Sequence, residues 1–361
     1  MLVYLADLMN WEGLIRTSYF RGFAAFLITL AVSLVFGRKF IDFLRKHQKK
    51  GQPIRENGPQ SHLLTKKGTP TMGGFLILGS SIFAMLLFCN LSNVFVWVGI
   101  SVLLIYGAVG FADDYVKVTK QTSNAMTAKM KLLLQFATAL AAVLIISHYT
   151  PIKYRYFLNF PYVSWKLYLS WLYIPFAMIV IAGASNGVNL SDGLDGLAGG
   201  LLSIVFVVFM IGAYVAGGVL AFNTSVPDIE GAQEIAVMCA AIIGGCLGFL
   251  RFNIKPASVF MGDTGSLALG AFLGVIAVML KQEILLAIAG GIFVMESISV
   301  MIQVGYFKLT KKRFFKMYFD IKKLILENAS LCLKFVQEHQ AKVFFSLDHL
   351  AEQRKMYSLL H

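Results

Sequence analysis

The chain contains 361 residues, of which 57% are hydrophobic and only 14% are charged. Soluble domains carry about 25% charged residues, so this composition excludes an ordinary soluble domain and predicts a polytopic membrane protein. The formal net charge of +13 gathers at the ends of apolar segments, which is typical of topology signals and of contact with anionic lipid. We therefore expect membrane lipids, and no nucleic acid, as partners.

Apolar segments of about 20 residues, the length that crosses a bilayer, recur along the chain and predict about nine transmembrane helices. They lie near residues 22–40, 72–90, 94–112, 132–149, 168–185, 197–219, 235–250, 266–281 and 284–306. The predicted fold is therefore an all-α, polytopic helix bundle. We expect one membrane domain over residues 1–317 and a cytoplasmic tail over residues 318–361, in which the stretch 321–347 is typical of an amphipathic helix.

Lysine and arginine residues set the expected orientation, because they favour cytoplasmic loops. The first long loop, Arg38–Lys67, carries nine of them, which places it in the cytoplasm and the N-terminus outside. Counting the spans onward places the C-terminus in the cytoplasm. The segment between residues 150 and 166 is an exception, since it carries Lys153, Arg155 and Lys166 on the expected outer side.

Three acidic sites stand at the edges of apolar segments, and the span count places all three on the cytoplasmic face. They are Asp113-Asp114, Asp192 with Asp195, and Asp263. A carboxylate at a membrane edge is costly unless it faces water, protein or a metal ion. Clustered carboxylates beside basic loops are typical of Mg²⁺ and phosphate chemistry, so these residues are candidates for the catalytic site of a membrane enzyme.

Each acidic site also has a structural interpretation. Asp113-Asp114 ends the third predicted span, where a charged helix end can anchor at the headgroups, although Lys or Arg is the usual anchor. The stretch 186–196 is predicted to be an Asn/Asp/Gly-rich loop, which offers oxygen ligands for a hard cation but also the residues that favour simple turns. Glu296 lies in the middle of the ninth span, either as a functional acid or as a hydrogen-bonded structural residue.

The residues around Asp263 suit a phosphate or nucleotide ligand. Gly262 allows a ligand to approach the backbone, and Phe260 either stacks on a base or packs in the core. Asp263 itself can hold Mg²⁺, which uses one or two protein carboxylates and leaves other positions to water and phosphates. Lys66 and Thr71 belong to a Gly-rich turn before the second span, where they either contact phosphate or, for the lysines, act as topology anchors.

Four motifs, taken in order, resemble those of the polyprenyl-phosphate N-acetylhexosamine-1-phosphate transferases, and within that superfamily the bacterial phospho-N-acetylmuramoyl-pentapeptide transferases. They read Gly68-Thr69-Pro70-Thr71-Met72-Gly73-Gly74, Phe111-Ala112-Asp113-Asp114-Tyr115, Asn189-Leu190-Ser191-Asp192-Gly193-Leu194-Asp195-Gly196-Leu197-Ala198 and Phe260-Met261-Gly262-Asp263. The stretch 296–304 favours the muramoyl-pentapeptide branch over its N-acetylglucosamine relatives. The resemblance covers residues 14–317.

The resemblance implies an enzyme of peptidoglycan synthesis in the bacterial inner membrane. Undecaprenyl phosphate would attack the β-phosphate of UDP-MurNAc-pentapeptide, releasing UMP and forming lipid I, with Mg²⁺ as the cofactor. Asp263 would hold Mg²⁺, and Asp113 and Asp114 would orient or deprotonate the lipid phosphate. The residues implied to contact the substrates are Lys66, Thr71, Lys129, Asn186, Asn189, Asp192, Asn253, Phe260 and Gly262. A homodimer is also implied, and a one-step and a covalent route both stay open.

The C-terminal segment departs from the family pattern. After Lys316-Met317 the family has a histidine triplet and a final span, whereas this chain has Ile321-Lys322-Lys323 at the positions of the triplet. If the histidines help to bind the diphosphate, activity would be sharply reduced or absent. The alternatives are therefore a sister UDP-N-acetylglucosamine transferase, an inactive product of an altered 3′ end and, from the acidic residues alone, an ion-coupled transporter.

Overall fold

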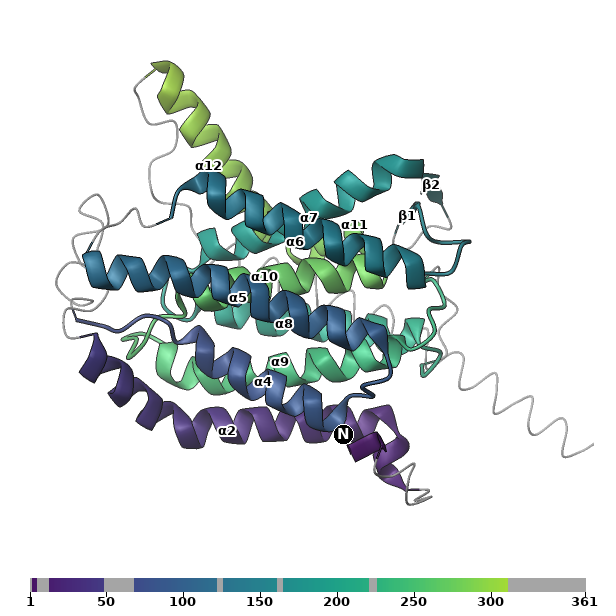
Figure 1. The fold of residues 1–361 in the computed structure, drawn as a ribbon, viewed down its shortest axis with the longest axis horizontal. Helices are drawn as coiled ribbons and strands as arrows, with labels where there is room; N and C mark the ends of the chain where they lie inside the picture. The colour runs from purple at the N-terminus through teal and green to yellow at the C-terminus, as the bar shows by residue number, and fades with distance from the viewer. Residues whose placement is uncertain are drawn as a thin grey trace, which may run out of the picture.

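The computed structural model describes residues 2–4, 13–48, 68–121, 126–160, 165–220 and 226–310, and Figure 1 shows how they are arranged. The helices are η1 (Leu14–Arg16), α2 (Ser18–His47), α4 (Gly74–Phe88), α5 (Val94–Lys120), α6 (Ala128–Tyr149), η2 (Ser170–Leu172), α7 (Tyr173–Ser191), α8 (Leu197–Ala216), α9 (Ala232–Asn253), α10 (Gly262–Met279), α11 (Glu283–Ala289) and α12 (Gly291–Thr310). Two short antiparallel strands, β1 (Phe157–Asn159) and β2 (Lys166–Tyr168), lie between α6 and α7. Lys66 and the predicted tail 318–361 lie outside the described residues.

The helix content confirms the prediction of an all-α polytopic bundle. Eight of the described helices are long and apolar enough to cross a membrane, and the 15-residue helix α4 is apolar but shorter. The ninth predicted span, 284–306, is not one continuous helix, because it divides into α11 and α12. The division falls at Gly290 and Gly291, and two adjacent glycines weaken a helix interior.

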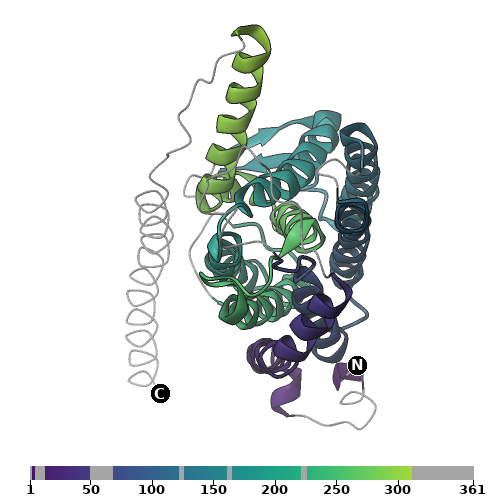
Figure 2. The ribbon, with the colours of Figure 1, turned by 90° about the vertical axis from the view of Figure 1, so that its left-hand side faces the viewer.

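Helix α10 forms the centre of the bundle, and every residue from Gly262 to Met279 is buried. It packs closely on α5 and α7, as the two views of the ribbon show (Figures 1 and 2). A methyl group at Gly270 would lie 2.6 Å from the carbonyl oxygen of Ala184 on α7. Small residues allow such close approach between membrane helices, so the position of the start of α10 is fixed by its neighbours.

Helix α12 reaches away from the rest of the bundle (Figure 2). Only two of its residues, Ile292 and Phe293, are buried, whereas Met301 is 65% exposed. Glu296, predicted in mid-span, lies half-buried on this helix. An exposed apolar surface of this kind fits a helix whose surroundings are lipid rather than water.

A buried ion pair fastens α2 to α9. The guanidinium of Arg21 donates to both carboxylate oxygens of Glu234, at 2.7 and 2.6 Å, and to the carbonyl oxygen of Phe88 at 2.9 Å. The backbone N–H of Asn90 also donates to Glu234, at 2.7 Å. The negative charge of Glu234 is therefore compensated by a bidentate contact with Arg21. This geometry offsets the cost of burying an ion pair.

Candidate active site

Helix α5 carries the Asp113-Asp114 pair beyond its apolar stretch. The sequence predicted that this span ends near residue 112, but the helix continues to Lys120. The reason is that Asp113 and Lys117, four residues apart on one helix face, form an ion pair of 2.7 Å. The Lys117 ammonium also lies 3.1 Å from Asp263, so the added turns of α5 are tied to the start of α10.

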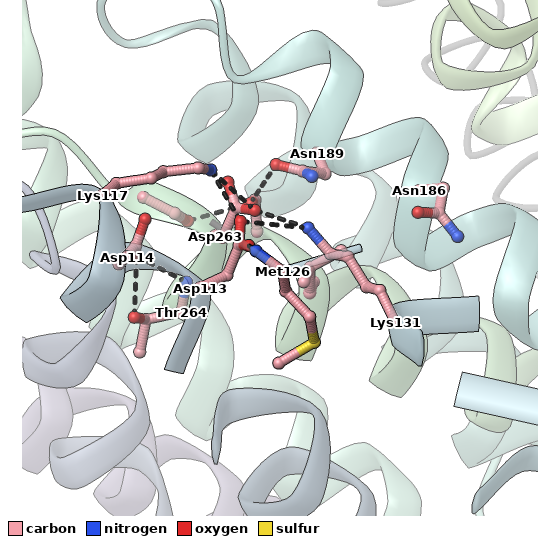
Figure 3. A network of polar contacts seen from close by, with 12 residues as sticks. Asp113, Asp114, Lys117, Met126, Lys131, Asn186, Asn189, Asp263 and Thr264 are labelled. Carbon is pink, nitrogen blue, oxygen red and sulfur yellow. Dashed lines mark hydrogen bonds and ion pairs between the residues drawn. The ribbon is translucent and has the colours of Figure 1, made fainter. Parts of the chain in front are cut away.

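The carboxylate of Asp263 stands in the first turn of α10, where the helix dipole favours negative charge. Its Oδ2 atom accepts a bond of 2.5 Å from the ammonium of Lys131, which comes from α6. Lys131 also lies 3.5 Å from Asp113, and the backbone N–H of Met126 donates to the other oxygen of Asp113 at 2.9 Å. Figure 3 shows the cluster. Two carboxylates and two ammonium groups from three helices thus meet in one small, mostly buried volume.

Asp114 points to a different set of neighbours. It is fully buried, and its Oδ2 atom accepts bonds from the backbone N–H and the hydroxyl of Thr264, at 3.0 and 2.8 Å. Within the described part of the chain its Oδ1 atom has no hydrogen-bond partner, and the same is true of the buried hydroxyl of Thr71. A methyl group at Gly262, whose φ is +75°, would lie 2.5 Å from both Asp114 and Thr71. Only glycine fits there, so these side chains converge on one point.

Two asparagines expected in a loop lie instead on a helix. Helix α7 continues to Ser191, so the prediction of a loop beginning at residue 186 is wrong. The amide of Asn186 donates back to the carbonyl oxygen of Ala182 at 2.8 Å and across to Gln135 on α6, also at 2.8 Å. Asn189 accepts a bond of 2.9 Å from Ser266 on α10. Asparagine favours turns, but here each of the two side chains also has a partner on a neighbouring helix, and the helix continues.

The turn between α7 and α8 is short, and the side chain of Asn253 holds it in place. The oxygen of Asn253 accepts from the backbone N–H of Gly196 at 2.9 Å, and its amide donates to the carbonyl oxygen of Val259 at 2.9 Å. Asp192 follows the last residue of α7 and is half-buried. The side chain of Asn253 is buried and joined to two loops, so its first role is to position the segments around the site.

The Gly-rich turn before α4 is paired with the motif that precedes Asp263. Phe260 donates from its backbone N–H to Pro70 at 2.9 Å, and its carbonyl oxygen accepts from Gly73 at 2.8 Å. The side chain of Gln48 accepts a bond of 3.0 Å from the backbone N–H of Thr71 and donates one of 3.2 Å to the carbonyl oxygen of Thr71. Two motifs that are almost 190 residues apart in sequence therefore lie side by side.

Comparison with known proteins identifies this arrangement. A family model described as glycosyl transferase family 4 matches residues 96–281, and a model described as phospho-N-acetylmuramoyl-pentapeptide-transferase signature 1 matches residues 66–78. The phospho-N-acetylmuramoyl-pentapeptide-transferase of Bartonella quintana (strain Toulouse) is 44% identical over 327 residues, which cover 88% of this chain and 89% of the relative. The protein of the same name from Ruegeria sp. (strain TM1040) is 47% identical over 320 residues, 88% of each chain.

The chain belongs to the phospho-N-acetylmuramoyl-pentapeptide-transferase family. The resemblance inferred from the four motifs is thereby confirmed. The family model spans both Asp113-Asp114 and Asp263, so the residues that the structure gathers are within the matched region.

Two lysines of the cluster were not singled out from the sequence. Lys117 carried a usable signal, because it stands four residues after Asp113 and so shares its helix face. Lys131 carried none that separates it from Lys129, which the resemblance had pointed to. The structure places the ammonium of Lys131 in the cluster, whereas Lys129 is exposed on the first turn of α6.

The oxygen atoms of this site suit a magnesium ion. Among the described residues no group of three or more His, Cys, Asp or Glu side chains gathers as a metal-binding set. Mg²⁺ does not require one, since it commonly uses one or two protein carboxylates together with water and substrate phosphates. Asp263 at the start of α10 is a donor of the right chemistry, and so is the buried Oδ1 atom of Asp114, which has no hydrogen-bond partner among the described residues.

Proposed function

We propose that the chain transfers phospho-MurNAc-pentapeptide from UDP-MurNAc-pentapeptide to undecaprenyl phosphate, forming lipid I and UMP for peptidoglycan synthesis. An oxygen of the lipid phosphate forms a bond to the β-phosphorus of the nucleotide, and the bond from that phosphorus to the bridging oxygen breaks, so that UMP leaves. Family membership supports the reaction. The observation that carries it is the cluster in which Asp113, Lys117, Lys131 and Asp263 meet.

The two lysines supply positive charge for the diphosphate. Lys117 and Lys131 form ion pairs with the carboxylates of Asp113 and Asp263. Each ammonium has three donors, so each can also donate to a phosphate oxygen that enters the cluster. Donors fixed in a partly buried site stabilise the charge that develops on transferring phosphoryl groups.

The aspartates on α5 have a positioning role in this proposal. A phosphate monoester with a second pKa near 6 is mostly ionised at pH 7, so little deprotonation of the lipid phosphate is needed. Asp114 is held by two bonds from Thr264, and this rigidity suits a residue that orients a reacting group. Asp263 would hold Mg²⁺, which when bound neutralises diphosphate charge and stabilises the leaving group.

The same proposal places the protein in the bacterial inner membrane, with this end of the bundle facing the cytoplasm. The eight long apolar helices support the membrane location, and the basic loops beside the acidic motifs support the orientation. We also propose a homodimer, on family resemblance alone.

A parallel assay of two nucleotide sugars tests the proposed donor. The full chain, purified in detergent, is given undecaprenyl phosphate, Mg²⁺ and either UDP-MurNAc-pentapeptide or UDP-N-acetylglucosamine, and UMP release is followed. We expect release only with the first nucleotide, and its loss in Asp263→Asn but not in Asp42→Asn, an exposed aspartate of α2. Release only with the second would replace the proposal by the sister transferase.

A further inference from the structure

The connection between α6 and α7 forms a compact surface at the end of the bundle opposite the carboxylates. We call residues 149–160 and 165–172 the outer hairpin; it contains β1, β2 and η2. Figure 1 shows the two strands where α6 ends and α7 begins. The hairpin starts at the last residue of one helix that is long and apolar enough to cross a membrane and leads into the next, so we expect it at the level where a bilayer ends.

The composition of this segment is unusual. Residues 149–172 include nine aromatic side chains and three cations, with no aspartate or glutamate. Trp165 is 74% exposed and Trp171 is 70% exposed. Exposed tryptophan and tyrosine concentrate at the interface between membrane and water, where the ring is apolar and its N–H or O–H is polar. The aromatic residues therefore predict contact with lipid headgroups rather than with open water.

The outer hairpin is held firmly in place by buried polar contacts. Lys281, fully buried after the end of α10, donates to the carbonyl oxygen of Arg155 at 2.8 Å, and its ammonium lies 3.5 Å from the centre of the Tyr173 ring. Asn159 donates to the carbonyl oxygen of Lys281 at 3.4 Å. Tyr173 in turn donates to Glu283. These contacts fix the hairpin to the ends of α7, α10 and α11, so its outward surface has a defined shape.

Two lysines present their charge from this surface. The ammonium groups of Lys153 and Lys166 both lie 4.8 Å from the centre of the Tyr154 ring, and both side chains are exposed. Contact with one ring keeps the two ammonium groups within about 10 Å of each other, and their remaining N–H groups can donate to other acceptors. A pair of cations on an aromatic base at headgroup level matches the phosphate of an anionic phospholipid.

We propose that the outer hairpin binds the phosphate groups of anionic phospholipids, through Lys153 and Lys166, with Trp165 and Trp171 inserted in the headgroup layer. The proposal accounts for the three cations on the expected outer side of the membrane, where the positive-inside rule predicts few, because positive charge on this hairpin serves lipid contact. It is independent of catalysis at the opposite end of the bundle. A protein partner is disfavoured, since the surface directly connects two helices that are long and apolar enough to cross a membrane.

Quenching of Trp165 by brominated lipid tests the proposal. The full chain with Trp11, Trp97 and Trp171 replaced by Phe is placed in phosphatidylcholine nanodiscs. These contain equal amounts of brominated chains on either phosphatidylglycerol or phosphatidylcholine. We expect quenching to be at least about twofold greater with brominated phosphatidylglycerol, since each cation near an anionic surface enriches it roughly fivefold.

Charge variants complete the test. Lys153→Gln with Lys166→Gln should abolish the preference for phosphatidylglycerol, as should high salt. Lys46→Gln, an exposed lysine at the far end of α2, should leave it intact. Equal quenching by both lipids in the protein that retains Lys153 and Lys166 would overturn the specificity for anionic lipid. Absence of quenching by either would overturn the membrane contact itself and indicate that protein covers the surface.

Discussion

The close contact of α5 with α10 predicts a sharp effect of one added methyl group. In Gly110→Ala the new Cβ atom would press on the carbonyl oxygen of Asp263 and lie 2.6 Å from the nitrogen of Thr264, both backbone atoms, where ordinary contact begins at 3.4 Å. The helices must separate by roughly 1 Å, and a misplacement of that size at reacting groups costs about 100-fold in rate. We expect such a loss of UMP release in a protein that is folded.

Gly107→Ala is the matched control. Gly107 lies three residues earlier on the same helix, and its added methyl group would meet first the end of the Leu78 side chain at 3.0 Å, which can rotate away. Overpacking of this kind costs about 1–3 kcal/mol of stability and should change the rate only a few-fold. Thermal unfolding in detergent is the control that checks whether both variants are folded. Equal activity of Gly110→Ala and Gly107→Ala would refute the account of how α10 is positioned.

Substitutions at four further places test other parts of the structure. Thr264→Val removes one of two bonds to the buried carboxylate on α5, which is worth about 1.5–3 kcal/mol, so UMP release should fall about 10- to 100-fold, whereas Thr264→Ser should restore it. Lys131→Met should lower the rate at least about 100-fold, and Lys129→Met should not; similar losses in both would contradict the assignment. Arg21→Met leaves a buried carboxylate uncompensated and should lower the free energy of unfolding by about 3–5 kcal/mol, seen as a lower melting temperature with activity retained in the cold. Placing histidine at all three of residues 321–323 should raise the rate, and an unchanged rate would show that the triplet is dispensable here.

Much of the fold follows from hydropathy, because a lipid environment leaves few alternatives to the helix. The boundaries do not follow as readily. The apolar run of the third span stops at Ala112, yet α5 continues to Lys120 because Asp113 and Lys117 find partners on it and on α10. The break at Gly290 likewise separates a stretch whose hydropathy is continuous.

The acids of the site were predictable from the sequence, and of its two lysines only Lys117 carried a signal. Asp113, Asp114 and Asp263 stand out because carboxylates are rare and costly beside apolar segments. Lysines near helix ends are common for reasons of topology, so nothing local distinguishes Lys131 from Lys129. Only the packing of α6 against its neighbours decides which ammonium reaches Asp263.

The most direct test of the central claim is to identify the lipid product of the full, unmodified chain. Purified protein is incubated with UDP-MurNAc-pentapeptide, undecaprenyl phosphate and Mg²⁺, and the products are measured by mass spectrometry. We expect UMP and undecaprenyl-diphospho-MurNAc-pentapeptide in equal amounts, with neither formed when Mg²⁺ is chelated. Folded protein that binds the nucleotide but forms no lipid diphosphate would contradict this expectation.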